Sequence, residues 1–140
     1  MRFVDSNVFL HAFLIPQRTL RVDEQRVKDG AKSIIERIEA SEEVVMTTVH
    51  LSEVVNIIES GLGLERSLGF LAWVITMENV AVHSTSMEDY KTAIVTARDY
   101  NISANDALAY AVMKDHGLEE IYSFDKHFDQ LRKITRLTSP

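Results

Sequence analysis

Short apolar runs alternate with longer stretches of helical periodicity along the whole chain, and this alternation constrains the fold more than any other feature. Compact apolar runs predict short strands at 2–5, 43–47, 79–84 and 119–124, with a fifth at 134–138. Helical patterning predicts helices at 6–14, 21–41, 48–60, 64–78, 86–101, 103–117 and 125–133. We therefore expect an α/β fold: a three-layer α/β/α sandwich with a central parallel sheet of four to five short strands.

Turn signals and chain length agree with this division. The helix at 48–60 is expected to end at Gly61 and Gly63, and the helix at 103–117 runs from the N-cap Ser103 to Gly117. The chain has 140 residues, which is enough for one ordinary domain and short for two. No repeat, low-complexity segment or interior linker interrupts it. We expect a single domain over residues 1–140.

Composition limits the chemistry that the chain can perform. Apolar residues make up 46% and charged residues 26%, a balance that is typical of a globular protein. The net charge of -6 argues against a polybasic nucleic-acid binder, although bound divalent cations change the local charge. The absence of cysteine excludes disulfides, thiolate zinc sites and a cysteine nucleophile. No signal peptide precedes the first strand and no apolar run approaches the ~20 residues of a membrane span, so we expect a soluble cytoplasmic protein.

Four acidic residues stand where a parallel sheet binds its ligands, beyond the carboxyl ends of the strands. Asp5 ends the first predicted strand and Asp125 follows the fourth, while Glu53 lies in the helix after the second. Asp106 is in the first turn of the helix that leads into the fourth strand. Acids that meet repel one another unless protons or cations neutralise them, and hard oxygen ligands select Mg²⁺ or Mn²⁺.

Each acid also has a purely structural interpretation. Asp5 and Asp125 stand at positions that cap the following helices, and Ser103-x-x-Asp106 has the spacing of a capping box. Glu53 is harder to explain in this way, because apolar residues four positions away on either side indicate a partly buried site. An unpaired buried carboxylate is unfavourable by several kcal/mol, so Glu53 needs a partner.

Four stretches in one order carry a resemblance to a known family: VDSN, TTVHLSEVVNII, ISANDALAYAVMKDHGL and IYSFDKHFDQL. Together they resemble the PIN-domain family of metal-dependent ribonucleases, and within it the VapC-like toxins of toxin–antitoxin pairs. The resemblance implies metal-binding acids at Asp5, Glu53, Asp106 and Asp125, with Asn7 and Ser123 as supporting polar residues. It also implies a PIN-like fold, an endoribonuclease activity with Mg²⁺ or Mn²⁺ as cofactor, an RNA substrate and a small antitoxin partner.

Two details depart from the compact members of that family, and three other readings compete with it. Ser123 stands where threonine is common, and the helix at 21–41 lengthens the stretch between Asp5 and Glu53. Haloacid-dehalogenase-like phosphatases need an aspartate where this chain has Asn7, and the acid pair and lysine pattern of receiver domains is absent. A catalytically weak PIN-like domain that acts as a protein-interaction module in RNA processing stays an alternative.

The remaining surface features leave their roles open. Basic residues that either hold RNA phosphates or are solvated surface charges are Arg18, Arg21, Lys126, His127, Arg132, Lys133 and Arg136. The residues His11, His50, His83 and His116 lack ligand spacing and are interpreted as ordinary core or surface histidines.

The segments 63–78 and 33–40 carry more apolar surface than one sheet face needs, which predicts a homodimer. Phe70 and Trp73 are expected either in the core or in the dimer interface.

Overall fold

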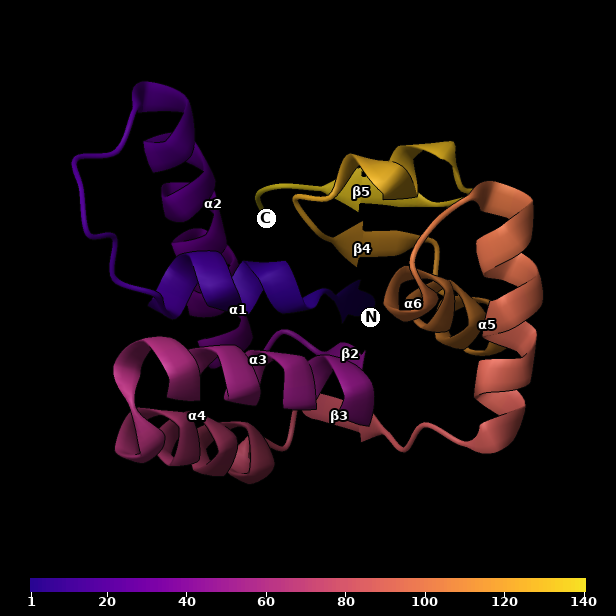
Figure 1. The fold of residues 1–140 in the computed structure, drawn as a ribbon, viewed down its shortest axis with the longest axis horizontal. Coiled ribbons are helices and arrows are strands. Elements are labelled where there is room, and N and C mark those ends of the chain that lie inside the picture. Colours follow the sequence, from indigo (N-terminus) through magenta and orange to yellow (C-terminus); the bar gives the residue numbers. More distant parts are fainter.

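Five short parallel strands form the central sheet of the computed structural model, which describes residues 1–140. The strands are Arg2–Val4 (β1), Val44–Thr47 (β2), Val80–His83 (β3), Glu120–Tyr122 (β4) and Thr135–Leu137 (β5), in the order β3-β2-β1-β4-β5 (Figure 1). Phe3 of β1 lies opposite Val45 of β2 and Ile121 of β4. The predicted fold class is confirmed, and the run at 134–138 supplies the edge strand β5.

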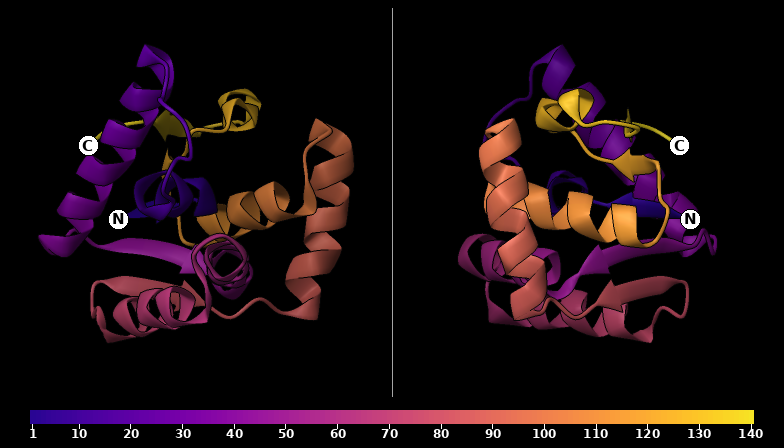
Figure 2. Two further views of the ribbon diagram at one scale, coloured as in Figure 1. Left: turned by 60° about the vertical axis from the view of Figure 1, so that its left-hand side comes forward. Right: turned by 90° about the vertical axis from the view of Figure 1, so that its right-hand side faces the viewer.

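Helices connect the strands and cover the sheet. They are Ser6–Phe13 (α1), Val22–Glu39 (α2), Thr48–Leu62 (α3), Leu64–Thr76 (α4), Met87–Tyr100 (α5) and Ala104–Asp115 (α6), with a 3-10 helix at Lys126–Gln130 (η1). Helices α1 to α4 gather on one side of the molecule, and on the other side α5 crosses α6 at a steep angle and packs against it (Figure 2). None of these helices combines the length and the apolar character that a membrane crossing requires.

Alternate residues of the strands face two separate hydrophobic clusters, as the two-residue period of a strand dictates. Val4 and Met46 pack with the apolar residues of α1 to α4, whereas Phe3, Val45 and Ile121 pack with those of α5, α6 and η1. Because β1 lies in the middle of the sheet, its carboxyl end opens between these two layers. This places the first residue after β1 at the edge where open parallel sheets generally bind their ligands.

Most predicted boundaries lie within two residues of the observed ones, and α3 and the segment 125–133 illustrate the differences. Helix α3 continues through Gly61 and ends at Leu62, because the chain turns only at Gly63, whose φ of 96° lies in the region that glycine adopts without strain. The short helix predicted at 125–133 is the five-residue 3-10 helix η1. In η1 the buried Phe128 anchors the segment to the second cluster, so the residues that follow β4 stay close to the sheet.

Candidate functional site

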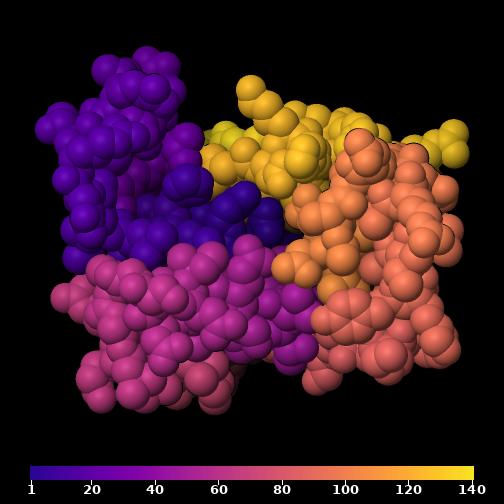
Figure 3. All heavy atoms as spheres, viewed as in Figure 1, coloured from indigo at the N-terminus to yellow at the C-terminus, as the bar shows by residue number.

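The four predicted acids line one cavity at the carboxyl end of the sheet. Asp5 follows β1, Glu53 projects from α3, Asp106 lies in the first turn of α6 and Asp125 follows β4. The cavity has a volume of about 440 Å³, and its other lining residues are Asn7, Ser103, Ala104, Asn105 and His127. The start of α1 (indigo), α3 (purple) and the start of α6 (orange) meet near the centre of the face in Figure 3. Segments far apart in sequence thus present carboxylates to one space.

Asp5 is 6% exposed, and its carboxylate is held by two donors. The backbone N–H of Ser6 donates to Oδ1 at 2.8 Å, and the hydroxyl of Ser123 donates to Oδ2 at 2.7 Å. The Ser123 oxygen in turn accepts from the backbone N–H of Asp125 at 3.0 Å and from the side-chain amide of Asn7 at 3.4 Å. One buried hydroxyl therefore couples Asp5 to Asp125. Ser123 lies behind the acids, while Asn7 reaches the cavity lining.

The capping interpretations hold for two of the acids and not for a third. Asp5 caps α1 through the N–H of Ser6, and Asp125 caps η1 by accepting from the N–H of His127 at 2.9 Å. In α6 the capping side chain is Ser103, whose hydroxyl accepts from the N–H of Asp106 at 3.1 Å. The carboxylate of Asp106 makes no bond back to the Ser103 N–H, so the capping box is incomplete and this carboxylate faces the cavity.

Burial and mutual repulsion raise the pKa values of Asp5 and Asp106. Burial raises the pKa of Asp5 to about 7, against the hydrogen bond from Ser123 that lowers it, and the nearby Asp106 and Glu53 raise it further. Burial also raises the pKa of Asp106 to about 6, and the neighbouring Asp125 adds to the increase. A carboxylate whose pKa lies this high stores unfavourable electrostatic energy at neutral pH. A cation in the cavity removes that energy.

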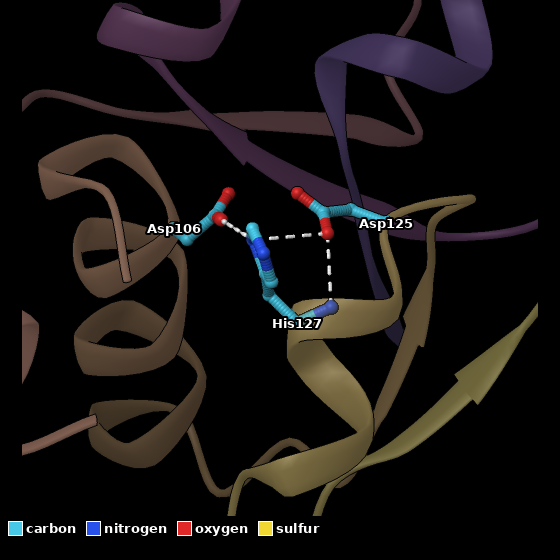
Figure 4. Close-up of side chains that lie close together, drawn as sticks. All are labelled: Asp106, Asp125 and His127. Carbon is cyan, nitrogen blue, oxygen red and sulfur yellow. Dashed lines mark hydrogen bonds and ion pairs between the residues drawn. The ribbon is translucent and has the colours of Figure 1, made fainter. Parts of the chain in front are cut away.

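Two residues that line the cavity, Asn105 and His127, are not among the site residues predicted from the sequence. The side-chain amide of Asn105 donates to Oε2 of Glu53 at 2.9 Å and supplies the partner that a half-buried carboxylate needs. Nδ1 of His127 lies 3.5 Å from Oδ2 of Asp106 and 3.2 Å from Oδ1 of Asp125 (Figure 4). The only signal in the sequence was proximity, because each residue stands one or two positions from an acid of the set.

His50 lies in the core, as expected, but directly behind the acids. Its side chain is 1% exposed, and Nδ1 shares a hydrogen bond of 2.6 Å with the hydroxyl of Thr47. Nε2 has no hydrogen-bond partner and lies 4.0 Å from Oδ1 of Asp5. Burial lowers the pKa of His50 to about 4, so the ring is neutral at neutral pH. An imidazole in this state adds no positive charge that could neutralise Asp5.

A second groove, in which Glu53 is the only charged lining residue, continues from the acidic cavity. It has a volume of about 490 Å³ and shares Glu53 and Asn105 with that cavity. Its remaining lining residues are Thr48, Val49, Ser52, Asn56, Thr85 and Tyr90. An apolar cavity of about 280 Å³ elsewhere in the molecule is lined by Phe13, Phe70 and Trp73, among others. Phe70 and Trp73 of α4 therefore line a different cavity from the acids.

Three of the predicted arginines form ion pairs with acids of the same chain, and Arg21 does so with Nε 3.5 Å from Asp23 and 3.2 Å from Glu24. The guanidinium of Arg18 makes two hydrogen bonds to Glu24, at 2.9 and 2.5 Å, and that of Arg136 makes two to Asp129, at 2.8 and 3.1 Å. These ion pairs partly neutralise arginines that are predicted either to hold RNA phosphates or to be solvated surface charges. They leave Lys126 as an exposed cation directly beside the acidic cavity, one residue from Asp125.

The donor set fits a divalent cation. Carboxylate oxygens are hard ligands that Mg²⁺ and Mn²⁺ accept, and all the acids approach the cavity from different segments. The oxygen and nitrogen atoms of Asp106, Asp125 and His127 lie within 4.8 Å of one another, which is the spacing of ligands around one ion. The raised pKa of Asp5 points the same way, because a cation stabilises the ionised form that burial penalises.

Comparison with known proteins agrees with this geometry. The family model described as PIN domain matches residues 2–134. The chain is similar to Ribonuclease VapC6 of Methanocaldococcus jannaschii, at 24% identity over 92% of this chain and 91% of the relative. That similarity extends over both proteins almost from end to end, so the two share their whole domain.

Solved structures show the same fold. The VapC20 toxin of Mycobacterium tuberculosis, described as cleaving the sarcin-ricin loop, has a TM-score of 0.70 at 20% identity and covers 96% of this chain and 98% of its own. A toxin–antitoxin complex from Klebsiella pneumoniae contains a chain with a TM-score of 0.65 at 15% identity, with 96% of each chain covered. With the family match extending over nearly all of its residues, the chain belongs to the PIN domain family.

Proposed function

We propose that this protein is an endoribonuclease that hydrolyses RNA with the help of Mg²⁺ or Mn²⁺, and that it is the toxin of a toxin–antitoxin pair acting in the cytoplasm. The observation that carries the proposal is the convergence of Asp5, Glu53, Asp106 and Asp125 on one cavity. Membership of the PIN domain family and the similarity to VapC ribonucleases support it. A domain that only binds other proteins has no need for this costly cluster, so the interaction-module alternative is not favoured.

The chain's own residues divide the work between holding the cation and orienting the reactants. Asp5, Asp106 and Asp125 present oxygen ligands, and the Ser123 hydroxyl fixes the spacing of the first and the last. Asn105 holds Glu53 where the acidic cavity meets the second groove, and there the other carboxylate oxygen of Glu53 can accept a proton of an attacking water molecule. A bound divalent cation supplies Lewis acidity, which lowers the pKa of water and stabilises charge on the phosphodiester.

Cleavage of RNA in the presence and absence of a chelator tests this proposal. We expect purified protein to cut internal bonds of total RNA with Mg²⁺ or Mn²⁺, and to stop when the chelator is in excess. An Asp125→Asn variant prepared in parallel should be inactive, which rules out a contaminating nuclease. Equal cleavage by both proteins, or cleavage that survives the chelator, contradicts the proposal.

We further propose that a small antitoxin protein binds this chain. The support is the similarity of fold to a chain in the toxin–antitoxin complex from Klebsiella pneumoniae. Co-expression with the short open reading frame next to its gene should yield a stable complex in which RNA cleavage is suppressed. If that product neither binds the chain nor reduces its cleavage of RNA, the toxin role is contradicted while the nuclease activity stands.

We also propose a homodimer, and of the two segments that predict it, only 63–78 still supports it. The isoleucines Ile34, Ile35 and Ile38 of segment 33–40 are buried in the chain's own core, so this segment gives no support. On α4, Leu68 and Ile75 are 47% and 70% exposed and lie seven residues apart on one side of the helix. Light scattering should report a dimer, and Ile75→Glu should dissociate it. The matched control Val22→Glu, at an exposed position of α2, should leave the dimer intact. A wild-type monomer at micromolar concentration contradicts this proposal.

We propose, finally, that residues 1–140 unfold as one domain. Strand β1 contributes Val4 to one hydrophobic cluster and Phe3 to the other, so loss of either cluster removes the centre of the sheet. The fluorescence of Trp73, which packs against the first cluster, should follow the same urea transition as the helical circular dichroism signal. Two separated transitions would contradict a single cooperative unit.

A further inference from the structure

The imidazole of His127 occupies a position between two of the acids that the proposed function assigns to the cation (Figure 4). Its backbone N–H is bound to Oδ1 of Asp125 at 2.9 Å, which fixes the start of η1 against that carboxylate. From there Nδ1 reaches to 3.2 Å from the same oxygen and to 3.5 Å from Oδ2 of Asp106. The ring is therefore directed into the acidic cavity although its side chain is 61% exposed.

These separations match those of neighbouring ligands around one octahedral ion. Bonds of roughly 2.1 Å place adjacent ligand atoms about 3.0 Å apart and opposite ones about 4.2 Å apart. The two distances from Nδ1 are close to the adjacent spacing, and all three ligand atoms of Asp106, Asp125 and His127 lie within 4.8 Å of one another. One nitrogen and two oxygens are therefore close enough together to bind a common ion.

We propose that His127 is a nitrogen ligand of the divalent cation held by Asp106 and Asp125, and that it makes the site select a transition-metal ion such as Mn²⁺ over Mg²⁺. The proposal rests on the proposed function, which assigns a cation to these acids. Mg²⁺ keeps to oxygen ligands and water, whereas imidazole nitrogen binds first-row transition-metal ions. A ligand set of oxygen and nitrogen atoms therefore discriminates between Mn²⁺ and Mg²⁺ better than a set of carboxylates alone.

Two other arrangements compete with this ligand. In the first, His127 only forms an ion pair with the acids and leaves when a cation enters, so no nitrogen binds the ion. In the second, the nitrogen comes from His50, whose unpartnered Nε2 lies 4.0 Å from Oδ1 of Asp5. The hydrogen bond of His50 to Thr47 and its full burial hold that ring behind Asp5 rather than in the cavity, which favours His127.

Pulsed electron paramagnetic resonance of the Mn²⁺-loaded protein tests the proposal, because a directly bound imidazole nitrogen modulates the manganese signal. Wild-type protein should show this ¹⁴N modulation. His127→Gln should lose it, while the matched control His116→Gln, an exposed histidine at the end of α6, should keep it. Titration of the same samples should show Mn²⁺ affinity reduced ~10-fold or more in His127→Gln, with Mg²⁺ affinity nearly unchanged.

Each outcome has a defined meaning. If wild type binds Mn²⁺ and cleaves RNA but shows no ¹⁴N modulation, the His127 ligand is wrong and the proposed nuclease function stands. A modulation that persists in His127→Gln and disappears in His50→Gln moves the ligand to His50 and also overturns the proposal. Binding of Mg²⁺ but not Mn²⁺ by wild type overturns this inference alone, whereas failure to bind either ion overturns both this inference and the proposed function. A metal-free melting curve of each variant that matches wild type excludes a folding defect.

Discussion

The hydroxyl of Ser123 donates a hydrogen bond of 2.7 Å to Oδ2 of Asp5, and this bond joins the carboxyl ends of two paired strands, β1 and β4. The Ser123 side chain is fully buried. Because the bond lowers the pKa of Asp5, it helps to keep that carboxylate ionised against its burial. The geometry of the acidic cavity therefore depends on a residue that does not line it.

Ser123→Ala should weaken the site without unfolding the protein. A hydrogen bond to a charged group contributes about 1.5–3 kcal/mol, so its loss should reduce cation affinity and RNA cleavage by at least ~10-fold. The effect should be larger at slightly acidic pH, since Asp5 then binds its proton more tightly. Titration of Mn²⁺ and cleavage assays measure it, with the exposed Ser84→Ala as control. Wild-type affinity in Ser123→Ala argues against any role for this bond.

Gly30→Ala should destabilise the fold through the C-terminal segment. A Cβ at Gly30 in α2 would lie 2.5 Å from the backbone oxygen of Thr138, which follows β5. Relief of such a contact requires α2 or β5 to move, and overpacking of this kind costs about 1–3 kcal/mol. Gly69→Ala in α4 is the matched control, since a Cβ there meets nothing within 4 Å.

The control should gain up to about 1 kcal/mol from the higher helix propensity of alanine. Urea denaturation of both variants measures the free energy of unfolding. If Gly30→Ala is as stable as Gly69→Ala, the close approach of α2 to the C-terminal segment does not exist in solution.

The stability of the cation-free protein should depend on pH through Asp5. Its pKa is about 7 in the folded protein and near the ordinary 3.8 when unfolded, so the folded state binds more protons between these values. The free energy of unfolding should therefore fall as pH rises from about 4 to about 7, and change little from this source outside that window. His50 acts in the opposite direction, because burial lowers its pKa to about 4.

The comparison that isolates Asp5 is between wild type and Asp5→Asn, which keeps His50. In excess chelator, wild type should lose stability relative to Asp5→Asn as pH rises through the window. Urea denaturation at several pH values measures the difference. Parallel curves for the two proteins show that Asp5 is not strained by its burial.

The main features of the fold followed from local patterns. The strand ends predicted the positions of Asp5 and Asp125, since the carboxyl ends of parallel strands meet at one edge. The apolar residues around Glu53 predicted that it needs a partner. They did not identify Asn105, because that contact depends on how α3 is placed against α6, which no local pattern encodes.

Residues that depend on tertiary placement were missed or assigned another role. His127 was read as a phosphate-binding or solvated cation, since its approach to Asp106 exists only after η1 packs beside α6. Arg18 is predicted either to hold RNA phosphates or to be a solvated surface charge, and the start of α2 places Glu24 within its reach. The apolar stripe of 33–40 predicted a dimer surface, whereas the length of α2 lets it cover the chain's own core. Each of these contacts depends on how two elements pack against each other, which the pattern of a single element does not show.

The central claim is that the acids hold a divalent cation on which RNA cleavage depends, and Asp106→Asn tests it most directly. The change is nearly isosteric, and the cap of α6 is Ser103, so the helix should be unaffected. Loss of one negative charge relieves the repulsion by Asp125 that raises the pKa of Asp106, and the cation-free variant should be at least as stable as wild type. Asp115→Asn, at the exposed end of the same helix, is the control.

The measurement is the melting temperature of wild type and both variants with and without Mn²⁺, together with one RNA cleavage assay. Stabilisation by a ligand scales as RT ln(1 + [L]/Kd), so weaker binding must reduce the Mn²⁺-induced rise in melting temperature. We predict a reduced rise and cleavage lower by orders of magnitude for Asp106→Asn, with wild-type values for Asp115→Asn. An Asp106→Asn protein that keeps the full Mn²⁺ shift and full cleavage would contradict the claim that these acids form a cation-dependent nuclease site.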